Sequence, residues 1–205
     1  RFVYVSSIGV NGLITDGTTK FSEKDDTNPH NAYALSKWEA EQALKRVASE
    51  TGLEVVILRP PLVYGAGAPG NFAQMLRLVD LGIPLPLANI KNKRDLLYVG
   101  NLVDALIMCA THPAAANNTF LVSDGESVST PEILRRLAKE LGVSSRVLPF
   151  PVSLLKLMAS MFGRADQLNR LAGSLQVDST KIRHQLGWLP PYSLQQGFNR
   201  TIRGN

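Results

Sequence analysis

Tyr33 and Lys37 lie four residues apart in the segment YALSKWEAEQAL, where the apolar spacing predicts a helix over residues 32–51. Residues four apart share one helical face, so a phenol and an ammonium group would be neighbours. A positive charge one turn away favours the phenolate, which suits a general acid and base. The alternative is a half-buried tyrosine beside a solvated lysine. Such a pair is expected about 0.2 times by chance, so the spacing alone does not decide.

The elements around this helix form a unit that could place a ligand beside the pair. The apolar run FVYVS at residues 2–6 and the β-branched run at 53–60 predict two buried strands. Strand, loop, long helix and strand make the βαβ unit of a parallel sheet. Ser6 and Ser7 stand at the end of the first strand, where open α/β sheets place their ligand crevice.

The second half of the chain predicts a smaller mixed part beyond a boundary near residue 60. One helix is expected to begin at Pro131, behind an N-cap at Thr130. The other expected elements are helices at 71–82, 100–113, 151–163 and 178–188 and strands at 94–99 and 119–124. We therefore expect residues 1–60 to belong to a doubly wound sheet, and residues 61–205 to form mainly an α+β domain with some segments returning to that sheet.

Composition excludes several classes of function. Apolar residues make up 44% of the chain and charged residues 19%, as in a soluble globular protein. The net charge of +5 comes without a dense basic stripe, so we expect no nucleic-acid partner. Three separated histidines predict no metal site, and the single cysteine, Cys109, predicts core packing in a reducing compartment. We expect a cytoplasmic protein.

Several motifs occur in a fixed order along nearly the whole chain. YVSSIGVNG, YALSK, LRPPLVYGAG, KRDLLYVGNLVDAL and LGWLPPYSLQQGF resemble the extended short-chain dehydrogenase/reductase family, in its sugar-nucleotide epimerase and reductase branch. The resemblance implies part of a Rossmann-type α/β fold with a smaller substrate domain. The family's Gly-rich dinucleotide fingerprint follows no strand in these residues, so the resemblance implies the part from mid-sheet onward, expected to be inactive alone.

The resemblance also implies site roles. Tyr33 would take a proton from a sugar hydroxyl, Lys37 would hold the nicotinamide ribose, and Ser7 would orient the reacting oxygen. Ser6, Pro60 and Val63 would line the nicotinamide of NAD, or of NADP. The expected substrate contacts are those of a UDP-sugar with Ser7, Asn71, Phe72, Arg94 and Arg170. Arg94 and Arg170 would grip the diphosphate, for which a guanidinium fork is suited.

Ile8 and Gly9 narrow the reaction, because dehydratases of this branch carry an Asp-Glu pair at that place. Without an acid and a base for adjacent carbons, elimination is disfavoured. Epimerisation at C4 of a UDP-sugar and reduction of a UDP-4-keto-6-deoxy-sugar in surface polysaccharide biosynthesis both stay open. Leu62 and Asn11 depart from residues common in epimerases, so the identity of the sugar stays undecided.

Two other classes of function remain as alternatives. One is a non-catalytic protein that senses dinucleotide and binds a partner. The other is a binder of phosphate-rich ligands without redox chemistry. A broad apolar face on the helix at 151–163 predicts packing on the substrate domain or on a second subunit of a homodimer. Its less favoured reading is contact with a membrane or a lipid-linked sugar.

Overall fold

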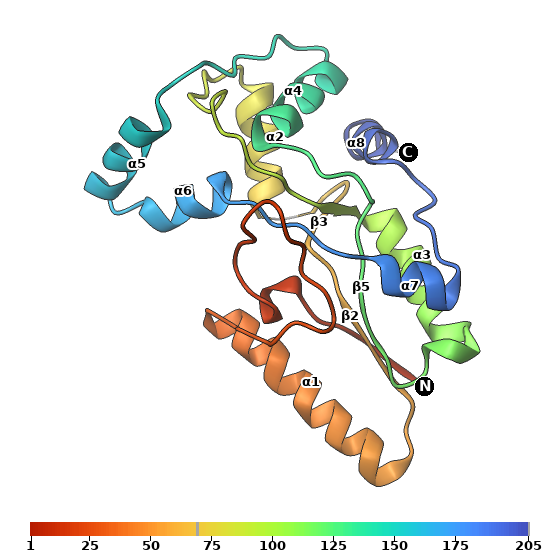
Figure 1. Cartoon of the computed structure of the whole chain (residues 1–205). Helices are drawn as coiled ribbons and strands as arrows, with labels where there is room; N and C mark the ends of the chain where they lie inside the picture. Colours follow the sequence, from red (N-terminus) through yellow and green to blue (C-terminus); the bar gives the residue numbers. More distant parts are fainter. Residues whose placement is uncertain (69, 205) are drawn as a thin grey trace.

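The computed structural model describes residues 1–68 and 70–204, except for the side chain of Asn71. Its centre is a parallel sheet in the order β1-β2-β5 (Figure 1). Strand β1 (Phe2–Val5) pairs with β2 (Val55–Arg59), which pairs on its other side with β5 (Thr119–Leu121). The chain therefore returns to the first sheet well after residue 60, while the boundary itself stays a prediction.

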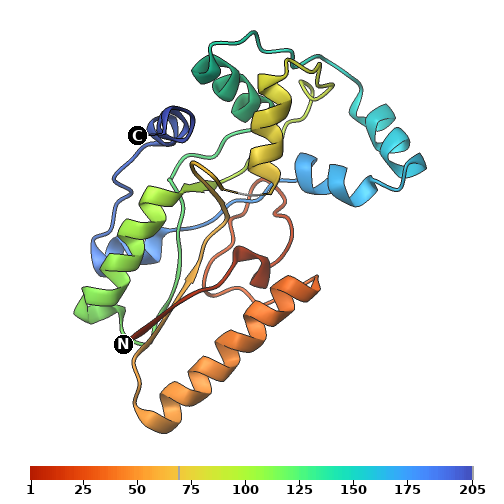
Figure 2. The same ribbon diagram turned by 180° about the vertical axis from the view of Figure 1, so that it is seen from behind.

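Helices cover both faces of this sheet. Helix α1 (Ala32–Thr51) lies on one side of the strands, and α3 (Val99–Thr111) with α7 (Thr180–Leu186) lies on the other (Figures 1 and 2). The period of two along a strand divides the side chains between the faces. Val56 and Leu58 pack with α3 and α7 in one apolar cluster. Arg59, of opposite parity to these two, instead contacts α1.

Helix α1 is held at both ends by local chemistry. The Asn31 side chain accepts a hydrogen bond from the Ala34 amide at 2.8 Å, which satisfies one of the free N–H groups of the first turn. Gly52 ends the helix at φ 74°, a left-handed conformation that costs glycine little. These caps agree with the helix predicted over residues 32–51.

A second core joins the sheet to a cap of helices. Strands β3 (Leu62–Tyr64) and β4 (Leu96–Tyr98) pair in parallel. Around them lie α2 (Asn71–Asp80), α4 (Thr130–Leu141) and α8 (Leu194–Arg203), and Figure 1 shows all three above the central sheet. The rings of Tyr64, Phe72 and Phe198 meet in this core with centroids 5.1–6.0 Å apart. The aromatic contacts hold the cap as one packed unit.

Helices α5 (Val152–Met161) and α6 (Ala165–Ala172) form a hairpin that extends to one side of the body (Figure 1). We call residues 152–172 the α5–α6 arm. None of the ten residues of α5 is buried. Short 3₁₀ turns, η1 (Ile8–Val10) and η2 (Pro113–Ala115), complete the elements.

The predicted elements are present, with three omissions and one correction. Sequence patterns did not indicate β3, α6 or α8. Strand β3 has three residues and α6 has eight, so neither spans enough chain to show a clear period. The N-cap of α4 is Ser129 rather than Thr130, because Ser129 accepts from the Glu132 amide. Thr130 is buried and bonds to the carbonyl of Leu171 instead.

Candidate active site

Tyr33 and Lys37 lie together over the end of β1. The Lys37 Nζ donates to the Val5 carbonyl at 3.0 Å and lies 5.8 Å from the centroid of the Tyr33 ring. It also lies 5.0 Å from the Tyr4 ring, a distance at which a cation is attracted to an aromatic face. Tyr33 is 61% exposed. The phenol is therefore open to a ligand while its cationic neighbour is held in place by the strand.

Ser7 lies in a turn that packs against the first turn of α1. Its Oγ accepts from the Gly9 amide at 3.1 Å and caps η1. A Cβ added at Gly9 would lie 3.3 Å from the Ser7 Oγ and 3.4 Å from the Ala34 Cβ. Ala34 follows Tyr33 directly, so the serine turn and the start of α1 share one small volume. The predicted trio of Ser7, Tyr33 and Lys37 is thus gathered at one edge of the sheet.

Beneath this edge lies a buried polar network. The Glu41 side chain is fully buried and is bound by Arg59, with Nε 2.9 Å from Oε1 and Nη2 2.5 Å from Oε2. Ser6 donates its hydroxyl to Glu41 Oε1 at 2.5 Å, and Arg59 Nη1 donates to Asn11 Oδ1 at 3.0 Å. The side-chain Nδ2 of Asn11 then donates to the Ser22 carbonyl. A two-point guanidinium–carboxylate pair fixes distance and orientation together.

This network sets the position of the catalytic candidates. Glu41 is one turn after Lys37 and two turns after Tyr33, so all three share a face of α1. Pinning Glu41 to β2 through Arg59, and to the end of β1 through Ser6, fixes how α1 sits over both strands. The hydroxyl of Ser6 points to the Glu41 carboxylate, and the residue is 3% exposed. The hydroxyl therefore serves the buried network, and the predicted place of Ser6 beside the nicotinamide stays a prediction.

The remaining predicted cofactor contacts follow β2. The Pro60 carbonyl accepts from the Ile8 amide at 2.9 Å and so joins the serine turn to the end of β2. Val63 lies on β3, partly buried against the sheet core. The carboxyl ends of β1 and β2 fit the ribose and nicotinamide end of a dinucleotide. The Lys37 ammonium has three N–H donors and uses one of them on the Val5 carbonyl, so the others are left for the ribose.

Arg94 and Arg170 come together from segments far apart in sequence. Arg94 Nη1 donates to the Arg170 carbonyl at 2.6 Å and to the Gly173 carbonyl at 3.1 Å, at the C-terminal end of α6. Burial lowers the pKa of Arg94 from its usual value. The groups that its guanidinium contacts are neutral carbonyls. Among the described residues no carboxylate lies within ion-pair distance of Arg94. A partly buried guanidinium without a counter-charge is suited to an anion.

His30 connects this cationic region to the start of α1. Partial burial, and then the charge of Arg170, lower the pKa of His30. Arg170 itself is exposed, with its side chain in the last turn of α6. The two predicted phosphate arginines therefore lie on the same side of the molecule as the turn that leads into Tyr33.

The two predicted contacts on α2 have different outcomes. Asn71 begins α2, but its side chain lies outside the described part of the chain. Phe72 is 1% exposed and packs against Tyr64 and Phe198. Its side chain is part of the core, and its predicted place near the nucleotide base stays a prediction. Only its backbone is left to contact the base.

Sequence reasoning missed Glu41 and Arg59, the ion pair of the buried network. Glu41 falls outside the apolar spacing of its helix, and Arg59 ends an apolar strand, so neither pattern indicates a contact between them. The available signal was an arginine in a run that otherwise predicts a fully buried strand, because a buried charge requires a partner. Finding that partner requires knowing which helical turn lies over β2.

Two other site types have no support in the described residues. Within residues 1–68 and 70–204, no cluster of three or more His, Cys, Asp or Glu side chains is placed to hold a metal ion. Across the same residues no helix combines the length and apolarity needed to cross a bilayer. Cys109 is buried in the core, and burial raises the pKa of its thiol to about 12.

Comparisons with known proteins place the chain in a family. Residues 1–123 match the model of the NAD dependent epimerase/dehydratase family. The chain belongs to this family. It is 48% identical over 204 residues to a UDP-glucose 4-epimerase of Vibrio cholerae, covering 99% of this chain and 62% of that protein. The chain thus spans about 62% of that relative's length.

The chain also covers less than two thirds of the length of more distant relatives. An Escherichia coli O157:H7 protein named N-acetyl-alpha-D-glucosaminyl-diphospho-ditrans,octacis-undecaprenol 4-epimerase is 25% identical over 220 residues, covering 99% of this chain and 64% of that protein. The solved UDP-glucose 4-epimerase of Thermus thermophilus, a complex with NAD, superposes with a TM-score of 0.74 at 23% identity, covering 98% of this chain and 62% of that one. The structural likeness establishes the Rossmann-type fold.

Proposed function

We propose that the protein containing this chain is an NAD-dependent enzyme that inverts C4 of a UDP-sugar. The observation that carries the proposal is the exposed Tyr33 phenol beside Lys37, with the ammonium held on the Val5 carbonyl at the ligand edge of the sheet. Family membership supports it, and so does the 48% identity to a protein named UDP-glucose 4-epimerase.

In this proposal Lys37 and the ends of β1 and β2 would hold NAD, which would supply the acceptor and then the donor of the hydride exchanged at C4 of the sugar. Tyr33 takes the proton of the C4 hydroxyl as the C–H bond breaks, and gives it back when that bond forms again. The Lys37 charge stabilises the phenolate between these two events. Ser7 offers its hydroxyl to the reacting oxygen, while its own turn is fixed by the Gly9 amide.

The substrate contacts follow from charge. Arg94 and Arg170 present guanidinium groups beside the start of α1, where a diphosphate would lie between them and the sugar. The dinucleotide pyrophosphate needs a Gly-rich turn that these residues do not contain, so the 205-residue chain alone should bind NAD very weakly. We further propose a cytoplasmic homodimer for the whole protein.

The test is the Tyr33→Phe variant of the full-length protein, with Tyr192→Phe as the matched control. Removing the transferable proton should lower kcat by about 10²–10⁴-fold while NAD and UDP-sugar still bind. Tyr192 lies against Asn101 of α3 and Arg200 of α8, on the face of the sheet away from α1, so its variant should keep wild-type kcat. A Tyr33→Phe enzyme with more than about a tenth of wild-type kcat would contradict the assignment.

The same assay separates the alternatives. An epimerase exchanges the two C4 epimers with no net consumption of NADH. A 4-keto-6-deoxy-sugar reductase consumes one NADH or NADPH per sugar reduced, and the absence of an Asp-Glu pair at Ile8-Gly9 is compatible with both. A non-catalytic sensor would bind dinucleotide without either reaction, and Tyr33→Phe would then change nothing.

A further inference from the structure

Helix α5 exposes an apolar surface that no other described part of the chain covers. Leu157, Met161 and Phe162 are 58%, 77% and 75% exposed, and Leu154 and Met158 are exposed beside them. By contrast α4, of similar length, buries six of its residues. Single exposed apolar side chains are common, but a contiguous group on one helix usually marks a binding surface.

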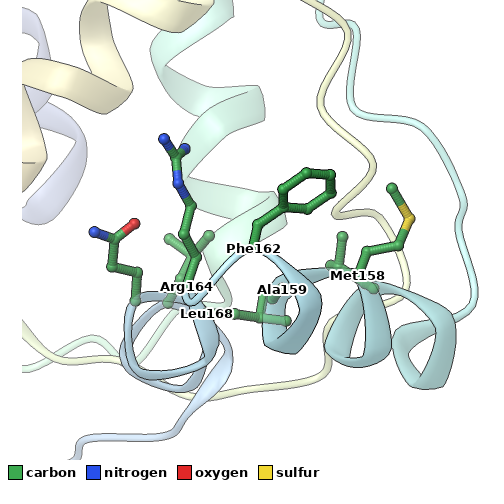
Figure 3. Close-up of a pocket in the computed structure, with 8 residues that line it drawn as sticks. Met158, Ala159, Phe162, Arg164 and Leu168 are labelled. Carbon is green, nitrogen blue, oxygen red and sulfur yellow. The ribbon is translucent and has the colours of Figure 1, made fainter.

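The surface continues into a groove between the two helices of the arm. The groove has a volume of about 520 Å³ and is lined mainly by apolar side chains, with Arg164 and Gln167 as its polar members. Figure 3 shows Met158, Phe162 and Arg164 extending to the same side of the hairpin. An aromatic ring, a thioether and a guanidinium therefore face outward together.

The charges of the arm have one predominant sign. Residues 141–165 contain no aspartate or glutamate, and the arm carries Lys156, Arg164 and Arg170 against the single carboxylate of Asp166. Neither Lys156 nor Arg164 has an ion-pair partner among the described residues. Apolar side chains flanked by unpaired cations match a surface that is apolar inside and anionic outside.

We propose that the α5–α6 arm docks on the surface of an anionic lipid bilayer. Met161, Phe162 and Leu157 would enter the boundary between headgroups and acyl chains, and Lys156 and Arg164 would lie among the phosphates. A second copy of the chain is a poorer occupant. A symmetric contact through this patch would bring the same cations face to face, which opposes association. This inference goes beyond the proposed reaction and does not depend on it.

The test measures binding of the full-length protein to vesicles by sedimentation. The vesicles are either phosphatidylcholine alone or an equal mixture with phosphatidylglycerol. Wild-type protein should sediment with the anionic vesicles, and more weakly with the neutral ones. Lys156→Gln with Arg164→Gln should weaken anionic binding by about fivefold for each cation removed. Met161→Glu with Phe162→Glu should weaken it by more than about tenfold.

The control is Ile107→Glu with Leu189→Glu. It changes net charge by the same amount at two exposed apolar residues, 59% and 65% exposed, outside the arm. This control should bind clearly more tightly than the Met161 and Phe162 variant. Equal loss in both double variants, or wild-type binding that ignores phosphatidylglycerol, would overturn the proposal. So would an arm variant that converts a wild-type oligomer to a monomer in the absence of lipid, because a second copy would then cover the face.

Discussion

The β1–α1–β2 unit and the α5–α6 arm place polar and apolar groups in opposite ways. Under α1 the chain buries a carboxylate and a guanidinium completely, although α1 buries only Ala34 and Glu41 of its twenty residues. In the arm the chain leaves leucines, methionines and a phenylalanine exposed. The first arrangement fixes one geometry at a catalytic edge, while the second leaves a face available for a partner.

The contrast shows that burial alone does not identify the residues on which function depends. A buried ion pair contributes little net stability over an apolar pair, but it tolerates few alternative positions. Exposed apolar groups cost the isolated chain little stability, and they contribute favourable free energy only when a partner covers them. Substitutions in the two regions should therefore differ in size and in kind.

The largest effect is expected from Glu41→Gln. The change leaves the Arg59 guanidinium buried without its counter-charge, which should lower the free energy of unfolding by about 3–5 kcal/mol. Urea denaturation measures it, with Glu39→Gln, an exposed neighbour on the same helix, as the control. Glu41→Leu combined with Arg59→Met should recover much of the loss. Similar stability of the Glu41 and Glu39 variants would mean that the pair does not hold α1.

Arg94→Ala should act mainly on substrate binding. Loss of a charge-assisted contact costs about 1.5–3 kcal/mol, so the KM for the UDP-sugar should rise about ten- to a hundredfold with NAD affinity nearly unchanged. Arg135→Ala, at an exposed position on α4, is the matched control. An unchanged KM would leave Arg94 with a structural role only, as the donor to the Arg170 and Gly173 carbonyls.

Asn31→Ala tests how far local capping holds the first turn of α1, which carries Tyr33. The Asn31 Oδ1 bond to the Ala34 amide is lost, which should cost about 1 kcal/mol of stability. Helix α5 has no side-chain cap at its Pro151 start, so no equivalent change exists there. Thermal unfolding is the measurement, and Asn28→Ala in the same loop serves as control. Equal melting temperatures for both variants would show that tertiary contacts alone hold α1.

The smallest effect is expected in the arm. Leu157→Ala should change stability by less than about 0.5 kcal/mol, because the side chain is already in water. The same change at Leu137 of α4, which is fully buried, should cost about 2–5 kcal/mol. Denaturant midpoints of the two variants compare the regions directly. A cost above about 1 kcal/mol at Leu157 would mean that the arm face is packed in solution.

The sequence by itself determined the βαβ unit and the Tyr33–Lys37 pair. Its signals are local: the β-branched runs of β1 and β2, the apolar spacing of α1 and the Gly52 stop act within a few residues. The ordered motifs also indicated the family to which the chain belongs.

Only the tertiary structure decided which polar groups meet. Ser6, Glu41 and Arg59 join across separations of 35 and 18 residues, and Arg94 reaches the Arg170 carbonyl across 76. Their pairing depends on how α1 and α6 sit on the strands, which no local pattern specifies. The same holds for Phe72 and Leu157, both apolar residues on helices. Packing buries the first in the core and leaves the second in water, because only the first helix has a neighbour over that face.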